Sequence, residues 1–132
     1  MKLVDTTFLV DLLRNKTDVV KKAKEIGKES PIFFSEISRF ELVIGCYALE
    51  GDISKRISAV DSLLHSFEPL PFNKEAATES GTIAGDLNRK GKQIDPSDTM
   101  IAGTALANGI SIIVTRNKTH FERIPEIMVE TY

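Results

Sequence analysis

Apolar residues follow two different spacings along this chain, and the two alternate from one end to the other. Short β-branched or apolar runs predict strands at residues 2–5, 31–34, 68–72, 110–114 and 127–130. Apolar residues three or four positions apart predict helices at residues 6–15, 17–27, 38–49, 53–67, 74–90 and 96–108. Strands that alternate with helices indicate an α/β domain, with a mainly parallel sheet of about five short strands and helices on both faces.

The strongest continuous signal runs from Asp95 to Phe121. Asp95 followed by Pro96 is typical of a helix start, because aspartate can cap the first turn and proline lacks a donor that is unused there. Asp98 then falls in the first turn of this helix. The residues that follow are small or aliphatic, so the helix is expected to pack closely on more than one face. The β-branched run at 110–114 predicts a strand that is buried on both faces.

Three further features carry packing predictions. Two prolines in the 68–72 run favour a position at the edge of the sheet. Gly81 and Gly85 in the long 74–90 helix are expected to allow close helix packing. An apolar stripe on the 38–49 helix is most simply interpreted as part of the core: Phe40, Ile44 and Tyr47.

The size and charge of the chain restrict the class of protein. Its 132 residues predict one domain spanning 1–132. A formal net charge of -2 argues against a protein that coats nucleic acid by charge alone, but not against a nucleic-acid enzyme with local positive charge. The single cysteine is typical of a reducing compartment. Because no apolar run approaches the roughly 20 residues of a membrane helix and no signal peptide is evident, we expect a cytoplasmic protein.

Polar side chains fall at the sheet edge where ligands bind in open α/β folds. Asp5 follows the first predicted strand, and Glu41 lies in the helix after the second. Asp98 lies beside the fourth strand, and Asn117 stands at its end. Each also has a structural interpretation. Asp5 could cap a helix, and Glu41 could close a capping box with Ser38. Asp98 suits a helix dipole, and Asn117 is an ordinary turn residue.

Taken together, the acids indicate a divalent cation. Carboxylates that converge on one sheet edge repel one another, and neither a cap nor a turn requires that cost. Mg²⁺ or Mn²⁺ removes the repulsion, prefers oxygen ligands and bridges to phosphate. Such an ion lowers the pKa of a bound water and stabilises charge on a phosphodiester. The glycine-rich motifs of dinucleotide sites and of P-loops do not occur in the sequence.

Three segments of the chain resemble a known family. They are V-D-T-T-F-L-V-D-L-L, S-R-F-E-L-V-I-G and D-T-M-I-A-G-T-A-L-A-N-G-I-S-I-I-V-T-R-N-K-T-H-F. In this order they resemble a PIN domain, specifically the VapC-type toxin ribonucleases. The resemblance implies a PIN-like, Rossmann-like fold and a Mg²⁺- or Mn²⁺-dependent endoribonuclease, the toxin of a type II toxin–antitoxin pair. It also implies a homodimer and a VapB-type antitoxin, for whose helix any exposed part of the apolar stripe would form a groove.

The resemblance assigns roles to individual residues. Asp5, Glu41 and Asp98 match the three acidic positions of the family, which hold the metal. Thr6 and Thr115 match positions where a hydroxyl supports the acids or a bound water. The best candidates for contact with RNA phosphates flank this site: Arg14, Lys16, Arg39, Arg116 and Lys118.

One position departs from the family pattern. The family often has a fourth acid after the last site-bearing strand, and Asn117 stands there, with His120 three residues on. Asparagine offers a neutral oxygen, so a second ion is expected to bind more weakly or only with substrate. We expect Asn117 and Thr115 to orient water or that second ion. Asp95 could add charge, although a cap role is the simpler prediction. His120 either donates to phosphate or packs at the strand edge.

Two alternatives to a nuclease are also consistent with the sequence. One is a catalytically inactive PIN-fold module that only binds RNA or protein. The other, less favoured, is a receiver-type phosphoacceptor switch, which needs a phosphorylatable aspartate at the end of a central strand and a lysine opposite. The strand that ends at Phe72 offers no such aspartate. Metal-dependent cleavage of RNA would separate these functions.

Overall fold

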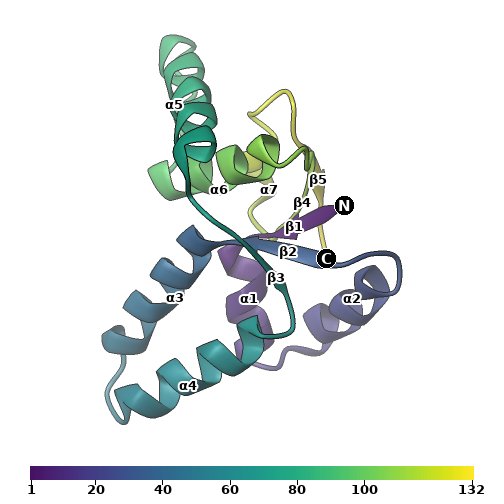
Figure 1. Cartoon of the computed structure of the whole chain (residues 1–132), viewed down its shortest axis with the longest axis vertical. Coiled ribbons are helices and arrows are strands. Elements are labelled where there is room, and N and C mark those ends of the chain that lie inside the picture. Colours follow the sequence, from purple (N-terminus) through teal and green to yellow (C-terminus); the bar gives the residue numbers. More distant parts are fainter.

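The computed structural model describes residues 1–132 and consists of a sheet with helices packed on both of its faces (Figure 1). The strands are β1 (Lys2–Val4), β2 (Ile32–Ser35), β3 (Glu68–Leu70), β4 (Ile112–Val114) and β5 (Met128–Glu130). The helices are α1 (Thr6–Leu13), α2 (Thr17–Gly27), α3 (Glu36–Ala48), α4 (Ile53–Leu64), α5 (Lys74–Arg89), α6 (Pro96–Ala107) and α7 (Lys118–Phe121).

The sheet has the strand order β3-β2-β1-β4-β5, and every neighbouring pair is parallel. The prediction of a mainly parallel sheet of about five short strands is confirmed. β3 lies at an edge, as its prolines indicated, because an edge strand needs fewer backbone donors. β1 lies in the centre between β2 and β4, so the residue that follows it, Asp5, leaves the middle of the sheet. All carboxyl ends therefore meet at one edge.

Each face of the sheet has its own hydrophobic core. On one face, Phe8, Phe34 and Val60 belong to a cluster contributed by α1 to α4 together with β1, β2 and β4. On the other face, Ile101 and Phe121 belong to a cluster contributed mainly by α5, α6 and α7. The helices accordingly separate into two groups, with α3 and α4 at one end of the molecule and α5 and α6 at the other (Figure 1).

Helix α6 begins as the sequence predicted, while α3 begins earlier. Asp95 caps α6 by accepting from the backbone N–H of Ser97 at 3.0 Å, and Pro96 occupies the first turn. The buried residues of α6 are distributed around the helix axis, which confirms that the helix packs on more than one face. In α3 the cap is Ser35, whose Oγ accepts from the N–H of Ile37 at 3.1 Å. The helix therefore starts at Glu36 rather than near residue 38.

Two packing predictions are wrong. The α3 stripe, defined here as Phe40, Ile44 and Tyr47, is not core: its members are 64%, 53% and 64% exposed. The buried face of α3 is instead formed by Ser38, Leu42 and Cys46, which are four residues apart along another side of the helix.

The glycine prediction fails for a related reason. A Cβ added at Gly81 or Gly85 would meet nothing within 4 Å, so these glycines are not at a close contact. The close approach lies at Gly103 of α6, where an added Cβ would overlap Oγ of Ser80 and lie 2.6 Å from its backbone nitrogen. Gly103 is thus the residue that allows α5 and α6 to touch. No helix of the structure combines the length and the apolar character needed to cross a membrane.

Candidate active site

Asp5 is the most deeply buried of the predicted acids, with 1% of its surface exposed. Its Oδ1 caps α1, accepting from the N–H of Phe8 at 3.1 Å and from the hydroxyl of Thr7 at 2.8 Å. Its Oδ2 accepts from the hydroxyl of Thr115 at 2.5 Å. The cap interpretation of Asp5 is correct, but it explains only one of the two oxygens. The other oxygen, Oδ2, is bound by Thr115, which directly follows β4.

Burial raises the pKa of Asp5 from 3.8 to about 6. The hydrogen bonds from Thr115, Thr7 and the Phe8 backbone oppose this change, since they favour the ionised form. The negative charge of Asp98 adds to the increase. Burial and a nearby like charge both disfavour an ionised Asp5, which is the condition that a bound cation reverses.

Glu41 lies in the second turn of α3, because α3 starts at Glu36. Its Oε1 accepts from the hydroxyl of Thr6 at 2.7 Å, and its Oε2 accepts from the hydroxyl of Ser97 at 3.1 Å. The capping-box interpretation of Glu41 is wrong, because Ser38 is inside the helix and its Oγ lies 2.9 Å from that of Thr6. Glu41 therefore faces the first turns of α1 and α6 rather than its own helix N-terminus.

Asp98 lies in the first turn of α6 and is partly buried. Its Oδ2 accepts from Nδ2 of Asn117 at 3.2 Å and lies 2.7 Å from Nδ1 of His120. Burial raises the pKa of Asp98, the contact with His120 opposes the increase, and the charges of Asp95 and Glu41 add to it. Asp98 is therefore near enough to the other acids for their charges to act on it.

Asn117 is held in place from two sides. Its backbone N–H donates to Oγ1 of Thr115 at 2.8 Å, and its side chain contacts Asp98. The structure thus brings together five of the residues that the sequence indicated: Asp5, Glu41, Asp98, Thr115 and Asn117. They come from the ends of β1 and β4 and from the first two turns of α3 and α6. One edge of the parallel sheet collects them all.

The donor set fits a hard divalent cation, since it consists of carboxylate oxygens with hydroxyl groups beside them. In the arrangement described here, however, no three histidine, cysteine, aspartate or glutamate side chains are placed so that they could hold one ion. The carboxylates turn instead toward neighbours: Thr6 and Ser97 hold Glu41, while Asn117 and His120 hold Asp98. Side-chain rotation would be needed for them to share an ion.

The basic residues predicted to contact RNA fall into two groups. Arg39 is paired with Glu36 at 3.0 Å and with Asp61 at 3.3 Å. Arg116 and Lys16 both pair with Asp11, at 2.9 and 3.0 Å. Two others, Arg14 and Lys118, are exposed and make no ion pair. These two carry the positive charge that is most available to a ligand.

Asp11 was not singled out by the sequence, yet it is as buried as Asp5, at 1% exposed. Burial disfavours its charge, but hydrogen bonds from Tyr132 and Lys16 and the charge of Arg116 outweigh burial and lower its pKa. The hydroxyl of Tyr132 donates to Oδ2 of Asp11 at 2.8 Å. Asp11 thereby ties the C-terminal residue and the loop after β4 to α1.

Other residues of the site were missed because their roles depend on tertiary contacts. Thr7 follows Thr6 in the T-T pair, and nothing in its spacing separates a cap hydroxyl from a site hydroxyl. Ser97 stands between Asp95 and Asp98 in D-P-S-D, and only the approach of α3 gives it Glu41 as a partner. The sequence indicates phosphate contact or packing for His120, whereas in the structure its Nδ1 lies 2.7 Å from Oδ2 of Asp98.

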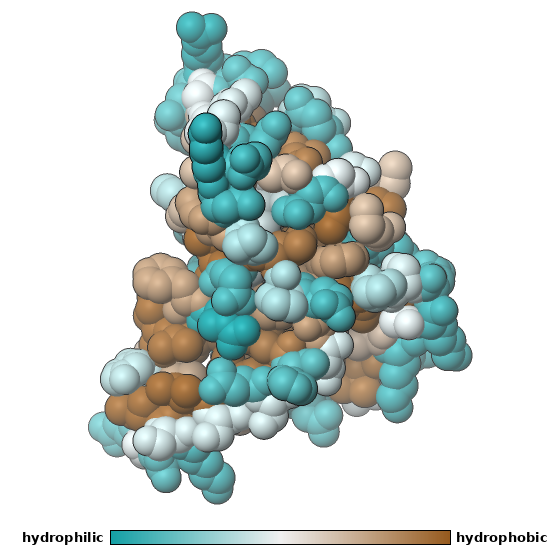
Figure 2. Space-filling view, viewed as in Figure 1, coloured by the Kyte–Doolittle hydropathy of each residue, from teal (hydrophilic) through white to brown (hydrophobic).

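An apolar groove begins beside Glu41 and runs between α1, α3 and α4. It encloses about 500 Å³ and is lined mostly by hydrophobic side chains, with Arg14, Glu41 and Arg56 as its charged members. Its hydrophobic lining is Val10, Leu13, Leu42, Cys46, Ala48, Leu49, Ala59 and Val60. Figure 2 shows hydrophobic side chains gathered at the surface over α3 and α4. Leu13 and Leu49 are 39% and 64% exposed, so this groove is not closed over.

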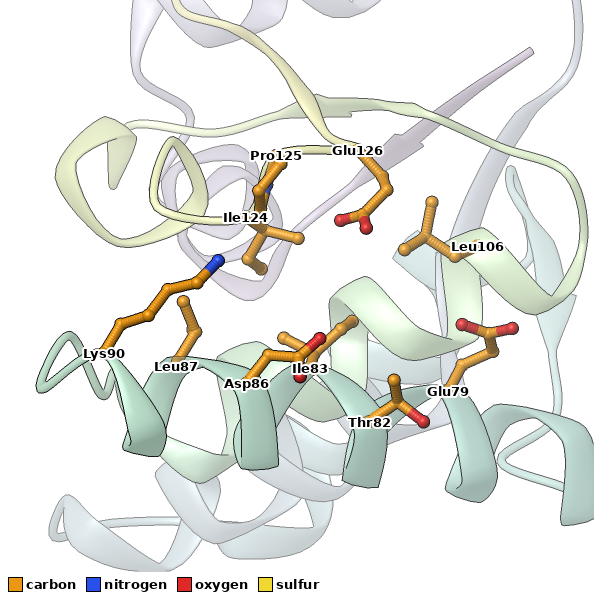
Figure 3. A pocket seen from close by; sticks show the side chains of 10 residues that line it. All are labelled: Glu79, Thr82, Ile83, Asp86, Leu87, Lys90, Leu106, Ile124, Pro125 and Glu126. Atoms are coloured by element: carbon orange, nitrogen blue, oxygen red, sulfur yellow. The ribbon is translucent and has the colours of Figure 1, made fainter.

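A second, smaller cavity lies on the opposite side of the molecule between α5, α6 and the segment before β5 (Figure 3). It encloses about 110 Å³, and its walls include Glu79, Asp86 and Lys90 of α5 and Pro125 and Glu126 of the facing segment. Ligand sites usually enclose about 300–1,000 Å³, so this cavity is too small for a drug-sized ligand. None of the clustered site residues lines it.

Comparison with known proteins gives a consistent result. The family model described as "PIN domain" matches residues 2–127. The tRNA(fMet)-specific endonuclease VapC of Salmonella typhimurium is 30% identical over 98% of this chain and 96% of its own length. Ribonuclease VapC19 of Mycobacterium tuberculosis is also 30% identical, over 96% of this chain and 97% of its own length.

Solved structures agree with the fold. VapBC from Salmonella typhimurium, solved bound to DNA, superimposes with a TM-score of 0.86 and 29% identity over 98% of this chain and 96% of that chain. VapBC2 from Rickettsia felis, solved bound to a DNA fragment from its promoter, gives a TM-score of 0.89 with 24% identity over 99% and 98%. At that identity the second likeness concerns the fold alone.

Proposed function

The chain belongs to the PIN-domain family, and from this membership and the acids at one sheet edge we propose that it is a metal-dependent endoribonuclease, the toxin of a toxin–antitoxin pair. One observation carries the proposal: Asp5, Glu41 and Asp98 come from separate elements and lie close enough to affect one another. Beside burial, the charge of Asp98 raises the pKa of Asp5, and the charge of Glu41 raises that of Asp98. Like charges gathered in this way are typical of functional sites. The ribonuclease and endonuclease names of the relatives support RNA as the substrate.

In this proposal Asp5, Glu41 and Asp98 hold Mg²⁺ or Mn²⁺. When bound, the ion supplies a Lewis acid that lowers the pKa of a water and stabilises charge on the phosphodiester. The hydroxyl of Thr115 fixes one oxygen of Asp5, and Thr6 fixes one oxygen of Glu41. Hydroxyl groups beside metal ligands usually orient them. In this proposal Glu41 turns away from Ser97 when the ion binds, so that the three carboxylates can share it.

The neighbouring residues bind and position RNA. Arg14 and Lys118 are the best candidates for contacts with phosphate, because neither is paired with an acid of this chain. Arg116 and Arg39 keep their ion pairs and are half-exposed, so they contribute weaker contacts at the rim. Asn117 offers an amide that can orient water. The carboxylate that the family often has there would add a charge.

The test is cleavage of a mixed RNA panel by the purified chain with Mg²⁺, Mn²⁺ or EDTA. Asp98→Asn is the test variant, because it keeps the size of the side chain and removes the charge. Asp86→Asn is the matched control, since Asp86 lies on α5 beside the small cavity, away from the site. We expect metal-dependent cleavage by the parent and by Asp86→Asn, and loss of cleavage in Asp98→Asn. Equal cleavage by all three would refute the site. RNA binding without cleavage would favour a binding module.

The groove between α1, α3 and α4 is the proposed docking surface for a VapB-type antitoxin. Most of the residues that line this groove are hydrophobic, so it can accept the apolar face of an amphipathic helix. Because Glu41 and Arg14 lie at its border, a segment that fills it would also reach the active site. The Salmonella typhimurium neighbour, solved as VapBC, supports a partner of this class.

This partner proposal is tested by co-purification with the product of an adjacent small gene. Leu13→Lys places a charge in the groove and is expected to weaken the complex by at least tenfold while leaving RNA cleavage intact. Met128→Lys is the matched control, because Met128 is 66% exposed and lies on β5, outside the groove. If both variants bind alike, the antitoxin docks elsewhere.

None of the three residues of the α3 stripe lines the groove, so the stripe is proposed as the contact surface of a homodimer instead of an antitoxin site. Three large hydrophobic side chains that are each more than half exposed are unusual on a monomer unless they bind something. Tyr47→Glu is expected to convert a dimer into a monomer in size-exclusion chromatography with light scattering, and an unchanged mass would rule this surface out. We further propose that the protein acts in the cytoplasm, where its RNA substrate is found.

A further inference from the structure

His120 and Asn117 converge on the same oxygen of Asp98. Oδ2 of Asp98 lies 2.7 Å from Nδ1 of His120 and 3.2 Å from Nδ2 of Asn117. The two nitrogens are themselves 2.9 Å apart. Three polar atoms from α6, α7 and the loop between β4 and α7 therefore form a triangle in which every side has the length of a hydrogen bond.

An ionised carboxylate cannot satisfy all three sides of this triangle. It only accepts hydrogen bonds, so His120 and Asn117 would both have to donate to it. Two donors would then face each other across 2.9 Å. If the Asn117 amide is flipped so that its oxygen and nitrogen exchange places, its oxygen lies 3.2 Å from Oδ2 of Asp98, and two acceptors repel each other. One side of the triangle is therefore unfavourable in each arrangement.

Of the three side chains, His120 is the one that can leave most easily. Its side chain is 37% exposed, compared with 14% for Asp98. The His120 side chain makes no hydrogen bond outside the triangle, whereas the backbone N–H of Asn117 donates to Thr115 close to its side chain. His120 lies on α7, which has 4 residues and is anchored by the buried Phe121 next to it. Rotation of the imidazole toward solvent leaves that anchor in place.

We propose that His120 is an internal competitor of the divalent cation at Asp98. In the metal-free protein its Nδ1 occupies one lone pair of Oδ2, and it turns toward solvent when the ion binds. Oδ2 of Asp98 has two lone pairs, and Asn117 and His120 face both of them. A cation that binds this oxygen must therefore displace one of the two side chains. The inference rests on the proposed function, because it takes Asp98 as a metal ligand.

The test is the affinity for Mn²⁺, followed through the paramagnetic resonance signal of free Mn²⁺ and without any RNA. Wild type, His120→Ala and His65→Ala are compared in the same buffer at one fixed pH near 8. His65 is the matched control, because it is exposed at the end of α4. Loss of a hydrogen bond to a charged group predicts a Kd about tenfold lower in His120→Ala and unchanged in His65→Ala.

The possible results separate this inference from the proposed function. Tighter Mn²⁺ binding by His120→Ala supports competition. Equal binding overturns it, and weaker binding overturns it by making His120 a ligand or a support of Asp98, while the metal site itself survives in both cases. Absence of Mn²⁺ binding in all three proteins overturns the metal site and the competition together.

A second measurement uses the unaltered protein and avoids any effect of substitution on folding. The chain has only 2 histidines, so its imidazole NMR signals are readily distinguished. Addition of diamagnetic Mg²⁺ is expected to shift the His120 signals toward those of a solvent-exposed imidazole and to leave His65 unchanged. If Mg²⁺ binds and His120 keeps its signals, the imidazole has not moved and the competition is refuted.

Discussion

Replacement of Asp5 by asparagine is expected to stabilise the fold at neutral pH while abolishing cleavage. Burial raises the pKa of Asp5 from 3.8 to about 6, although Thr115, Thr7 and the Phe8 backbone donate to it. A carboxyl with a raised pKa contributes most to stability below the unfolded pKa of 3.8, and this contribution is lost as the pH rises through about 6. Above that range the difference between the two values corresponds to about 3 kcal/mol of destabilisation.

Asparagine never ionises, so it removes this destabilisation. Its Oδ1 can accept from the Phe8 N–H and the Thr7 hydroxyl, as the carboxylate does. Its Nδ2 replaces an acceptor by a donor, so the Thr115 hydroxyl must turn to accept. The Thr115 hydroxyl oxygen already accepts a hydrogen bond from the backbone N–H of Asn117, so the new bond is expected to be weaker. One weakened hydrogen bond costs about 1 kcal/mol, which leaves an expected net gain of about 1–2 kcal/mol at pH 7.

Urea unfolding at a series of pH values, with EDTA present, measures this difference. The stability difference between Asp5→Asn and wild type is expected to be small near pH 4 and to grow to a plateau above about pH 6. Asp11→Asn is the matched control, because Asp11 is equally buried but has a lowered pKa. Its substitution should therefore destabilise the protein at neutral pH. A difference for Asp5→Asn that is negative, or that does not change with pH, would refute the account of Asp5.

Further predictions follow from other contacts. Gly103→Ala should destabilise the protein by about 1–3 kcal/mol in thermal unfolding, because its Cβ would overlap α5, whereas Gly81→Ala should stabilise it by about 0.5–1 kcal/mol. Mg²⁺ at about 100 times its Kd should stabilise wild type by about 2.7 kcal/mol and leave Asp98→Asn unchanged in the same assay. Thr115→Val removes a donor that lowers the pKa of Asp5, so the rise of cleavage rate with pH should move to higher pH.

The sequence was sufficient for the parts of the site that follow from topology. Asp5 and Asn117 follow strands. Asp98 lies near the start of a helix that Asp95 and Pro96 predict. Because parallel strands direct their carboxyl ends to one edge, these residues had to meet whatever the details of packing. Glu41 followed from the same argument, although α3 begins earlier than expected.

The contacts that hold the acids could not be predicted in this way. Ser97 and His120 reach Glu41 and Asp98 across elements, and no local spacing encodes such pairs. The exposure of the α3 stripe was missed because periodicity identifies an apolar side of a helix without showing what covers it. Helix α3 has apolar residues on more than one side, and only one side faces the sheet.

The order of the elements along the chain has a consequence for synthesis. All residues of the groove lie between positions 10 and 60, whereas the active site also requires Asp98 and Thr115. A chain that grows from its N-terminus therefore completes the segments of the proposed antitoxin-docking groove before the last residues of the candidate active site are made. During synthesis, the surface proposed for inhibition therefore leaves the ribosome before the site proposed for RNA cleavage is complete.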